Sequence, residues 1–314
     1  MLICLSGLLI QAQPVSNYSQ YTGYGQLNRE TLLILRQFKQ NDQLQFLTVN
    51  PNTLETRVVP AKTIAAQRLS WEALKKQFSN TPYIKAIQFA QLQSFSLQDA
   101  GIIHGYPKEK GITLTIDLCP SHKPLDRQVF TDLFTAFGDI EKPVPVALSL
   151  SGHFLLNHIA DINWLQQLER ENSIRITWIN HTYSHFYDPK VPLQDNFLLK
   201  PGTNIDREVL QNEIAMLEQG LLPSVFFRFP GLVSDNKVVN IITGYGLIPI
   251  GSDAWLAKGQ PAISGGIVLI HGNGNEPVGV ADFIRLLKTE KNAVLEKQWL
   301  LYDLRYSIGS EFKN

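Results

Sequence analysis

From residue 111 onward, short apolar runs alternate with segments whose apolar residues recur at helical spacing. The apolar runs are 111–118, 143–152, 173–180, 224–231, 247–253 and 266–272. The helical patterns are 126–137, 159–171, 235–246 and 280–291. Strands that alternate with helices of crossover length are typical of a parallel α/β sheet or barrel. The pattern predicts a (β/α) barrel over residues 111–314.

The first third of the chain has a mixed pattern. Residues 27–38 read as a helix, residues 43–60 as a hairpin whose turn contains Asn50, Pro51 and Asn52, and residues 70–78 as a second helix. We expect a small α+β lobe over residues 14–110 that precedes the barrel.

Polar residues follow several of the predicted barrel strands. They are Asp117, His181, Arg228, Asp253 and His271. In a (β/α) barrel the carboxyl ends of the strands meet at one face, where the βα loops build the active site. We therefore expect these five side chains to lie near one another.

The composition sets limits on the partners. The 314-residue chain carries 28 basic and 28 acidic residues, so no overall field attracts it to nucleic acid or to an acidic membrane. No apolar run reaches the roughly 20 residues that a transmembrane helix needs. We expect no nucleic-acid partner and no membrane span.

The first 13 residues resemble a secretory signal peptide, with an apolar core followed by small and polar residues near Ala12 and Gln13. A buried N-terminal strand is the alternative. The sequence favours export to the periplasm or the extracellular space. Cleavage would remove Cys4 and leave Cys119 as the one cysteine, so we expect no disulfide framework.

The segment NHTYSHF contains His181 and His185, which are four residues apart. On a helical turn, residues at this spacing share a face and both imidazoles reach one ion. Histidines that serve only packing or surface hydrogen bonds are the alternative. Asp117 would add a carboxylate that serves as a third ligand or as a general base, although a turn aspartate is the simpler interpretation.

Two other residues have chemistry of their own. Arg228 interrupts an apolar strand, and a buried arginine needs an acidic partner such as Asp117. His271 lies between a predicted core strand and a Gly/Asn loop, a position that suits a proton donor, with a hydrogen-bonded core histidine as the alternative.

The motifs TIDLCP, HTYSH, RFPG, SDAW and LIH, in this order, resemble those of the polysaccharide deacetylase family, also called the NodB homology or carbohydrate esterase family 4 group. The resemblance covers residues 111–290 and implies a distorted (β/α) barrel of the polysaccharide deacetylase type. It also implies a divalent metal, usually zinc, and removal of N-acetyl groups from an amino-sugar polymer or oligomer of the cell envelope.

Site roles follow from the same resemblance. It makes His181 and His185 metal ligands and Asp117 the catalytic base. It makes Arg228 the residue that orients this base and His271 the general acid. Asp253 and Trp255 belong to the motif SDAW, so the resemblance makes Asp253 a catalytic residue and Trp255 a wall of the pocket. We expect Trp255 and Tyr183 to bind the substrate.

The first motif departs from the family pattern. Leu118 stands where the family has its metal-binding aspartate, and Cys119 stands where glycine is usual. The missing ligand then comes from Asp117, from the Cys119 thiolate or from Asp188, and we favour Asp117. The leading hypothesis is a metal-dependent carbohydrate deacetylase. A catalytically silent carbohydrate-binding protein without the metal is the rival, and hydrolysis of a small non-sugar amide is a third option.

Overall fold

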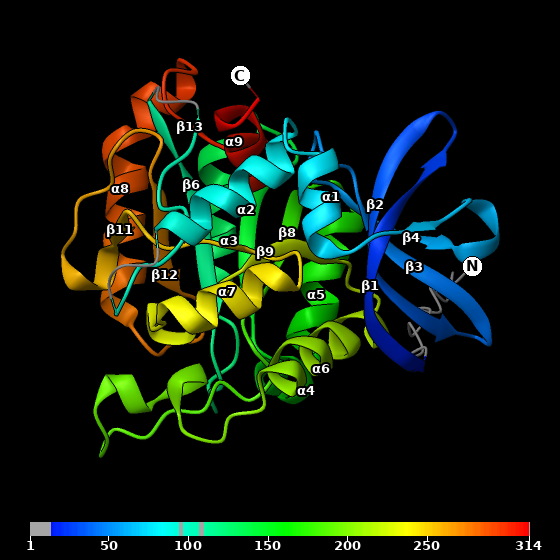
Figure 1. Cartoon of the computed structure of the whole chain (residues 1–314). Coiled ribbons are helices and arrows are strands. Elements are labelled where there is room, and N and C mark those ends of the chain that lie inside the picture. The colour runs from blue at the N-terminus through cyan, green and yellow to red at the C-terminus, as the bar shows by residue number, and fades with distance from the viewer. Residues whose placement is uncertain (1–13, 94–96, 107–109, 314) are drawn as a thin grey trace, which may run out of the picture.

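The computed structural model describes residues 14–93, 97–106 and 110–313. Residues 1–13, which carry the predicted signal peptide, lie outside the described residues. An antiparallel sheet at the N-terminus stands beside a larger body built on a parallel sheet (Figure 1).

The N-terminal sheet has the strand order β4-β3-β2-β1-β5, and its pairs are antiparallel. Its strands are β1 (Val15–Leu27), β2 (Glu30–Gln40), β3 (Gln43–Val49), β4 (Thr56–Pro60) and β5 (Gln67–Arg68). The hairpin predicted over residues 43–60 is β3 and β4, and the helix predicted over residues 70–78 is α1 (Trp71–Gln77). Ser70 begins α1 by accepting a hydrogen bond from the Ala73 amide.

The helix predicted over residues 27–38 is wrong, because these residues form the end of β1 and most of β2. Both faces of β2 are buried: Leu32 and Ile34 pack with Phe46, while Leu33 and Leu35 pack against the larger body. A strand that is buried on both sides has a continuous apolar run rather than an alternating one. Periodicity alone does not distinguish such a run from a buried helix.

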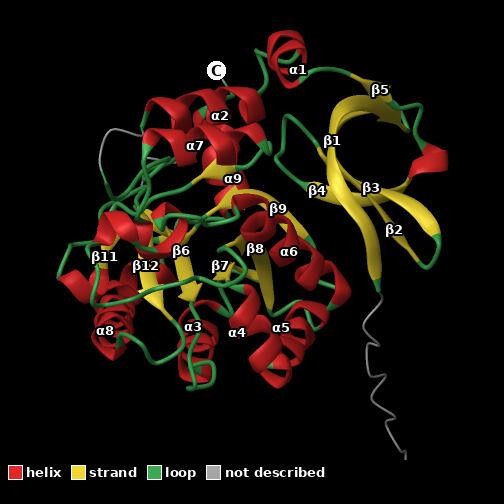
Figure 2. Cartoon of the chain, turned by 60° about the horizontal axis from the view of Figure 1, so that its bottom comes forward, coloured by secondary structure: helices red, strands yellow, loops and turns green. Residues whose placement is uncertain are grey.

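The larger sheet has the order β10-β9-β8-β7-β6-β12-β11, with every pair parallel. Its strands are β6 (Gly111–Leu118), β7 (Val144–Leu150), β8 (Ile174–Asn180), β9 (Pro223–Phe227), β10 (Ile248–Pro249), β11 (Ala254–Trp255) and β12 (Ile267–His271), and β13 (Leu300–Leu301) pairs with the start of β6. The sheet curls into a half-barrel (Figure 2). This arrangement confirms the predicted distorted (β/α) barrel.

Helices lie on both sides of the curled sheet (Figure 2). They are α2 (Pro82–Leu92), α3 (Arg127–Phe137), α4 (Gly152–Asn157), α5 (Ile159–Arg170), α6 (Ile205–Glu218), α7 (Asn236–Gly244), α8 (Pro277–Leu295) and α9 (Leu304–Glu311). The largest core cluster joins one face of the sheet to α3, α5 and α8 through residues such as Phe130, Leu165 and Phe283. Burial of these side chains supplies the main free energy of folding.

The segment 98–104 bridges the open side of the half-barrel. Ile102 forms a parallel bridge with Ile250, just after β10, and His104 forms an antiparallel bridge with Gly266, just before β12. The amide of Ile267 donates to the carbonyl of Ile103. Residues outside the predicted barrel segment therefore complete its wall.

A second core cluster crosses residue 110, where the sequence places the boundary between lobe and barrel. Tyr83 and Ile87 of α2 pack in this cluster with Leu33 of β2 and with Ile248 of β10. Helix α2 thus belongs to the packing of the barrel although it precedes residue 111. Among the described residues, no helix combines the length and the hydropathy needed to cross a bilayer.

Candidate active site

Strand β6 delivers two candidate residues to the site. Along β6, Ile112, Leu114, Ile116 and Leu118 contribute to the core cluster that contains α3 and α8. Successive side chains of a strand point to opposite faces, so Thr115 and Asp117 point to the other side, into the half-barrel. Cys119, the next residue of this second series, follows the end of β6.

The turn after β8 carries the histidine pair. His181 is fully buried and follows the last residue of β8, but residues 181–185 form no helical turn. Instead, Thr182 and His185 have positive φ angles of 66° and 49°. Buried Asn180 holds this turn, because its Oδ1 accepts hydrogen bonds from the Thr182 amide and from the Asn212 side chain. The two imidazoles still meet, with ring centroids 4.8 Å apart.

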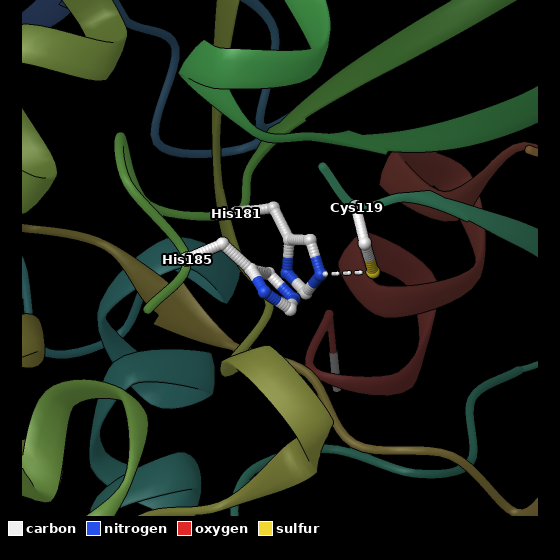
Figure 3. A group of neighbouring side chains, drawn as sticks. All are labelled: Cys119, His181 and His185. Carbon is white, nitrogen blue, oxygen red and sulfur yellow. Dashed lines mark hydrogen bonds between the residues drawn. The ribbon is translucent and has the colours of Figure 1, made fainter. Parts of the chain in front are cut away.

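Three possible metal-ligand atoms converge at this point (Figure 3). One ligand atom each from Cys119, His181 and His185 lie within 4.8 Å of one another. Cys119 Sγ is 3.5 Å from His181 Nε2. His181 Nδ1 lies 2.9 Å from the Arg228 carbonyl oxygen. A carbonyl oxygen only accepts hydrogen bonds, so Nδ1 carries the proton and Nε2 is free to bind a metal.

Asp117 lies beside this cluster, with its side chain on the inner face of the half-barrel. Its Oδ2 is 3.8 Å from His181 Nε2, and its side chain is almost fully buried. Arg228 is also fully buried; its Nη2 donates a hydrogen bond to Thr115 Oγ1, and its charge interacts with that of Asp117. Burial lowers the pKa of Arg228, although Asp117 and Asp99 oppose this effect. The charges of Arg228 and Asp117 interact, but among the described residues no hydrogen bond or ion pair joins the two side chains.

His271 stands at the other side of the cluster, at the end of β12 and directly beside Asp117 in the strand register. Its Nδ1 lies 2.8 Å from Glu276 Oε2. The same oxygen of Glu276 accepts a hydrogen bond of 2.7 Å from the indole nitrogen of Trp255. One carboxylate therefore positions both the imidazole and the indole.

The buried neighbours of Cys119 and His271 shift the pKa values of both residues strongly. Burial raises the pKa of Cys119, but His185, His271 and a hydrogen bond with His181 outweigh it and bring this pKa well below its usual value. Burial lowers the pKa of His271, but Cys119 and Glu276 raise it well above the ordinary value. Buried groups with strongly shifted pKa values in a cleft are typical of functional sites.

The cluster forms the floor of a pocket of about 810 Å³. Cys119, His185, His271 and Glu276 line it, and its walls carry aromatic side chains, which are Phe186, Tyr187, Phe197 and Trp255. Tyr187 stacks on Phe197 with ring centroids 5.3 Å apart. The Lys258 ammonium lies 3.6 Å from the centre of the Trp255 ring.

Two residues predicted for the site lie elsewhere. The Asp253 amide donates to the Ile267 carbonyl, which places Asp253 at the start of β12 rather than at its carboxyl end, and its carboxylate lies 2.6 Å from His104 Nδ1. Tyr183 packs on His153, and it is not among the residues that line the pocket. Trp255, two residues after Asp253, lines the pocket, whereas Asp253 does not.

Sequence reasoning missed Glu276, and it missed Tyr187 and Phe197 in the loop between His185 and Lys200. Glu276 comes directly before Pro277, the first residue of α8. Acidic residues are common at the start of helices, so the sequence gives no reason to assign Glu276 to the site. Its position five residues after His271 was the one available signal. The aromatic residues of the loop have no spacing that would separate a pocket wall from packing.

Comparisons with known proteins give the following matches. A family model described as the RP012 protein N-terminal domain matches residues 21–84, which span most of the antiparallel sheet, α1 and the start of α2. A family 4 carbohydrate esterase from Bacillus anthracis is 18% identical, with a TM-score of 0.49, over 71% of this chain and 91% of that chain. PdaA, a family 4 carbohydrate esterase of Bacillus subtilis, is 16% identical, with a TM-score of 0.47, over 69% of this chain and 94% of that chain.

A third solved structure is a family 4 pseudoenzyme from Bacillus anthracis, 15% identical with a TM-score of 0.44 over 72% of this chain and 81% of that chain. All three identities are below 20% and all three TM-scores are below 0.5. We therefore derive the function from the side chains of the site. Two of these structures are described as family 4 carbohydrate esterases and the third as a pseudoenzyme of that family.

Proposed function

We propose that this chain is a metal-dependent hydrolase that removes N-acetyl groups from an amino-sugar polymer or oligomer. One observation carries the proposal: a carboxylate, the two imidazoles of one turn and a third imidazole, from three different segments, lie close together at one pocket. Amide hydrolysis needs an activated water, stabilisation of an oxyanion and a proton for the departing amine. The site offers a group for each requirement.

The donor set fits a divalent metal. His181 presents Nε2, and the buried Nε2 of His185 has no hydrogen-bond partner among the described residues, as expected for an atom that awaits a ligand. When bound, such an ion lowers the pKa of water and polarises the substrate carbonyl. We propose His181 and His185 as two of its ligands.

The proton chemistry belongs to Asp117 and His271. Asp117 Oδ1 is buried and has no hydrogen-bond partner among the described residues, so it is available to accept a proton from water. The buried Arg228 guanidinium, held by Thr115, places a positive charge near Asp117. His271, which lies 2.8 Å from Glu276 Oε2 and whose pKa is raised by Cys119 and Glu276, is the group we propose to give a proton to the leaving nitrogen.

The pocket suits a sugar. Pyranose rings have apolar faces that pack on aromatic side chains, and polar edges that remain hydrated at an open rim. Tyr187 is exposed, and the rings of Trp255 and Phe197 line the same pocket. We propose Trp255 as a wall that contacts the sugar, because its ring also touches His271, with the two ring centroids 5.7 Å apart.

The test measures acetate released from N-acetylglucosamine oligomers by the metal-loaded protein. We expect Asp117→Asn to lower kcat by about 100-fold or more while the metal content stays the same, because the variant loses its base and keeps the two histidines. His181→Ala with His185→Ala should lose both metal and activity. Full metal content without acetate release from any acetylated oligomer would sink the deacetylase proposal.

A second candidate is a catalytically silent carbohydrate-binding protein. It is favoured by Leu118, which occupies the family's ligand position and points into the core with no exposed surface. Calorimetry with acetylated oligomers separates the two candidates. Binding that is the same with and without metal, and without acetate release, supports the silent binder.

A further inference from the structure

We infer that Cys119 supplies the third protein ligand of the metal in place of a carboxylate, and that the site therefore selects a thiophilic ion such as zinc. This inference rests on the proposed function, which needs a metal at His181 and His185. It goes further because it moves the ligand position by one residue along the chain, from 118 to 119, and changes its chemistry from oxygen to sulfur.

The separation of the donor atoms fits this assignment. Zinc binds thiolate at about 2.3 Å and imidazole at about 2.0–2.1 Å, so two such ligands at a tetrahedral angle lie about 3.5 Å apart. Cys119 Sγ is 3.5 Å from His181 Nε2, and the three donor atoms all lie within 4.8 Å of one another. Two imidazoles and one thiolate also make three protein ligands, the number that catalytic zinc sites have.

The alternation of side chains along β6 explains why residue 119 can be a metal ligand and residue 118 cannot. Leu118 belongs to the series of β6 side chains that packs against the helices, and it is fully buried there. Cys119 follows the series of Asp117, which points into the half-barrel. Its side chain lines the pocket, whereas the side chain of Leu118 does not.

The other candidates fit less well. Asp188 accepts a hydrogen bond from the Lys190 amide on an exposed turn and does not line the pocket. Asp117 Oδ2 is 3.8 Å from His181 Nε2, but Asp117 is not part of the three-donor cluster. The structure thus favours Cys119 over Asp117, the ligand favoured from the sequence, and leaves Asp117 free as the base.

The ligand set also decides which ions compete. Magnesium, calcium and manganese prefer oxygen ligands, while thiolate and imidazole suit zinc and its spectroscopic substitute cobalt(II). A site in which the one carboxylate is replaced by sulfur should bind zinc much more tightly than manganese. Replacing Cys119 by aspartate should reduce this preference.

The first experiment adds cobalt(II) to the metal-free full-length chain and records the near-ultraviolet charge-transfer band that a thiolate ligand produces. Cys4→Ser is the matched control, because Cys4 and Cys119 are the two cysteines of the sequence. We expect wild type and Cys4→Ser to show the band, and Cys119→Ser to lose it. Zinc affinity of Cys119→Ser should fall about 100-fold or more, beyond the 10- to 100-fold typical of an outer-shell change.

The outcomes separate this inference from the proposed function. If cobalt binds to wild type without the charge-transfer band, Cys119 is not a ligand, whereas the metal site of the proposed function stands. If neither cobalt nor zinc binds to wild type, both fail. Should Cys119→Ser not fold, X-ray absorption of the zinc-loaded wild type decides the question, since a sulfur ligand contributes a shell at about 2.3 Å and its absence overturns the assignment.

Discussion

At the scale of single residues, the site depends on side chains that hold other side chains in place. Glu276 is the clearest case, because one of its oxygens lies within 2.8 Å of His271 Nδ1 and accepts the Trp255 indole hydrogen bond. It acts as a positioning residue for the proposed general acid. The sequence predicted its partners, His271 and Trp255, as site residues, but it did not predict Glu276.

Glu276→Gln should lower kcat by about 10- to 100-fold with little change in KM, because the imidazole remains but loses its orientation and charge partner. Glu276 raises the pKa of His271, so the variant's imidazole loses its proton at lower pH. The alkaline limb of kcat against pH should therefore move to lower pH. Exposed Glu296 offers a control, and equal pH profiles for Glu276→Gln and Glu296→Gln would contradict the role.

At the scale of elements, the wall of the pocket is an irregular segment, residues 186–200, that one buried side chain holds together. Asn196 Oδ1 accepts from the Asp188 amide at 2.7 Å, and its Nδ2 donates to the carbonyls of Asp188, Val191 and Pro192. The short 3-10 turns Leu193–Asp195 and Phe197–Leu199 lie on either side of it. Because this segment forms no strand or α-helix, the hydrogen bonds of the Asn196 side chain fix the course of its backbone.

Asn196→Ala should destabilise the protein by about 1–3 kcal/mol, because it leaves buried backbone groups without partners. The substitution should also speed amide hydrogen exchange in residues 186–200 and raise KM more than it lowers kcat. Mass spectrometry of exchanged peptides checks the first effect, with peptides from β6 as the internal reference. The adjacent exposed Asp195 provides the control, since Asp195→Ala should change neither quantity. Unchanged exchange in Asn196→Ala would refute the role.

At the scale of the whole molecule, a buried ion pair joins the antiparallel sheet to the half-barrel. Arg36 of β2 contacts Glu213 of α6 at 2.7 Å, and each side chain is only 1% exposed. Tyr18 donates to Glu213, and Arg36 also donates to the Tyr245 carbonyl. The sheet is therefore fixed on the barrel by polar contacts as well as by the shared core around α2.

Glu213→Gln should lower the free energy of unfolding by about 3–5 kcal/mol, because it leaves the Arg36 charge buried without its counterion. Urea unfolding measures the change. The ion pair of Arg285 and Asp282, in which the Arg285 side chain is 75% exposed, is the control, and Asp282→Asn should cost only about 0–1 kcal/mol. The double replacement Arg36→Met, Glu213→Leu should recover much of the lost free energy of unfolding. If Glu213→Gln and the control variant lower this free energy equally, the buried ion pair does not fix the sheet on the barrel.

The sequence by itself determined the parallel α/β body, because alternating strand and helix patterns with buried faces leave few other architectures. It also selected Asp117, His181, Arg228 and His271, whose positions at strand ends follow from local patterns. It failed for residues 27–38, where burial of both faces of β2 gives the same apolar run as a helix.

Only the tertiary structure decided the rest. It placed Asp253 with His104 at the start of β12, brought Glu276 to His271, and set Cys119 rather than Leu118 beside the histidines. Each of these pairings depends on where neighbouring strands begin and end and on which face a side chain occupies. Such relations join residues that are distant along the chain, and a local pattern of apolar and polar positions does not contain them.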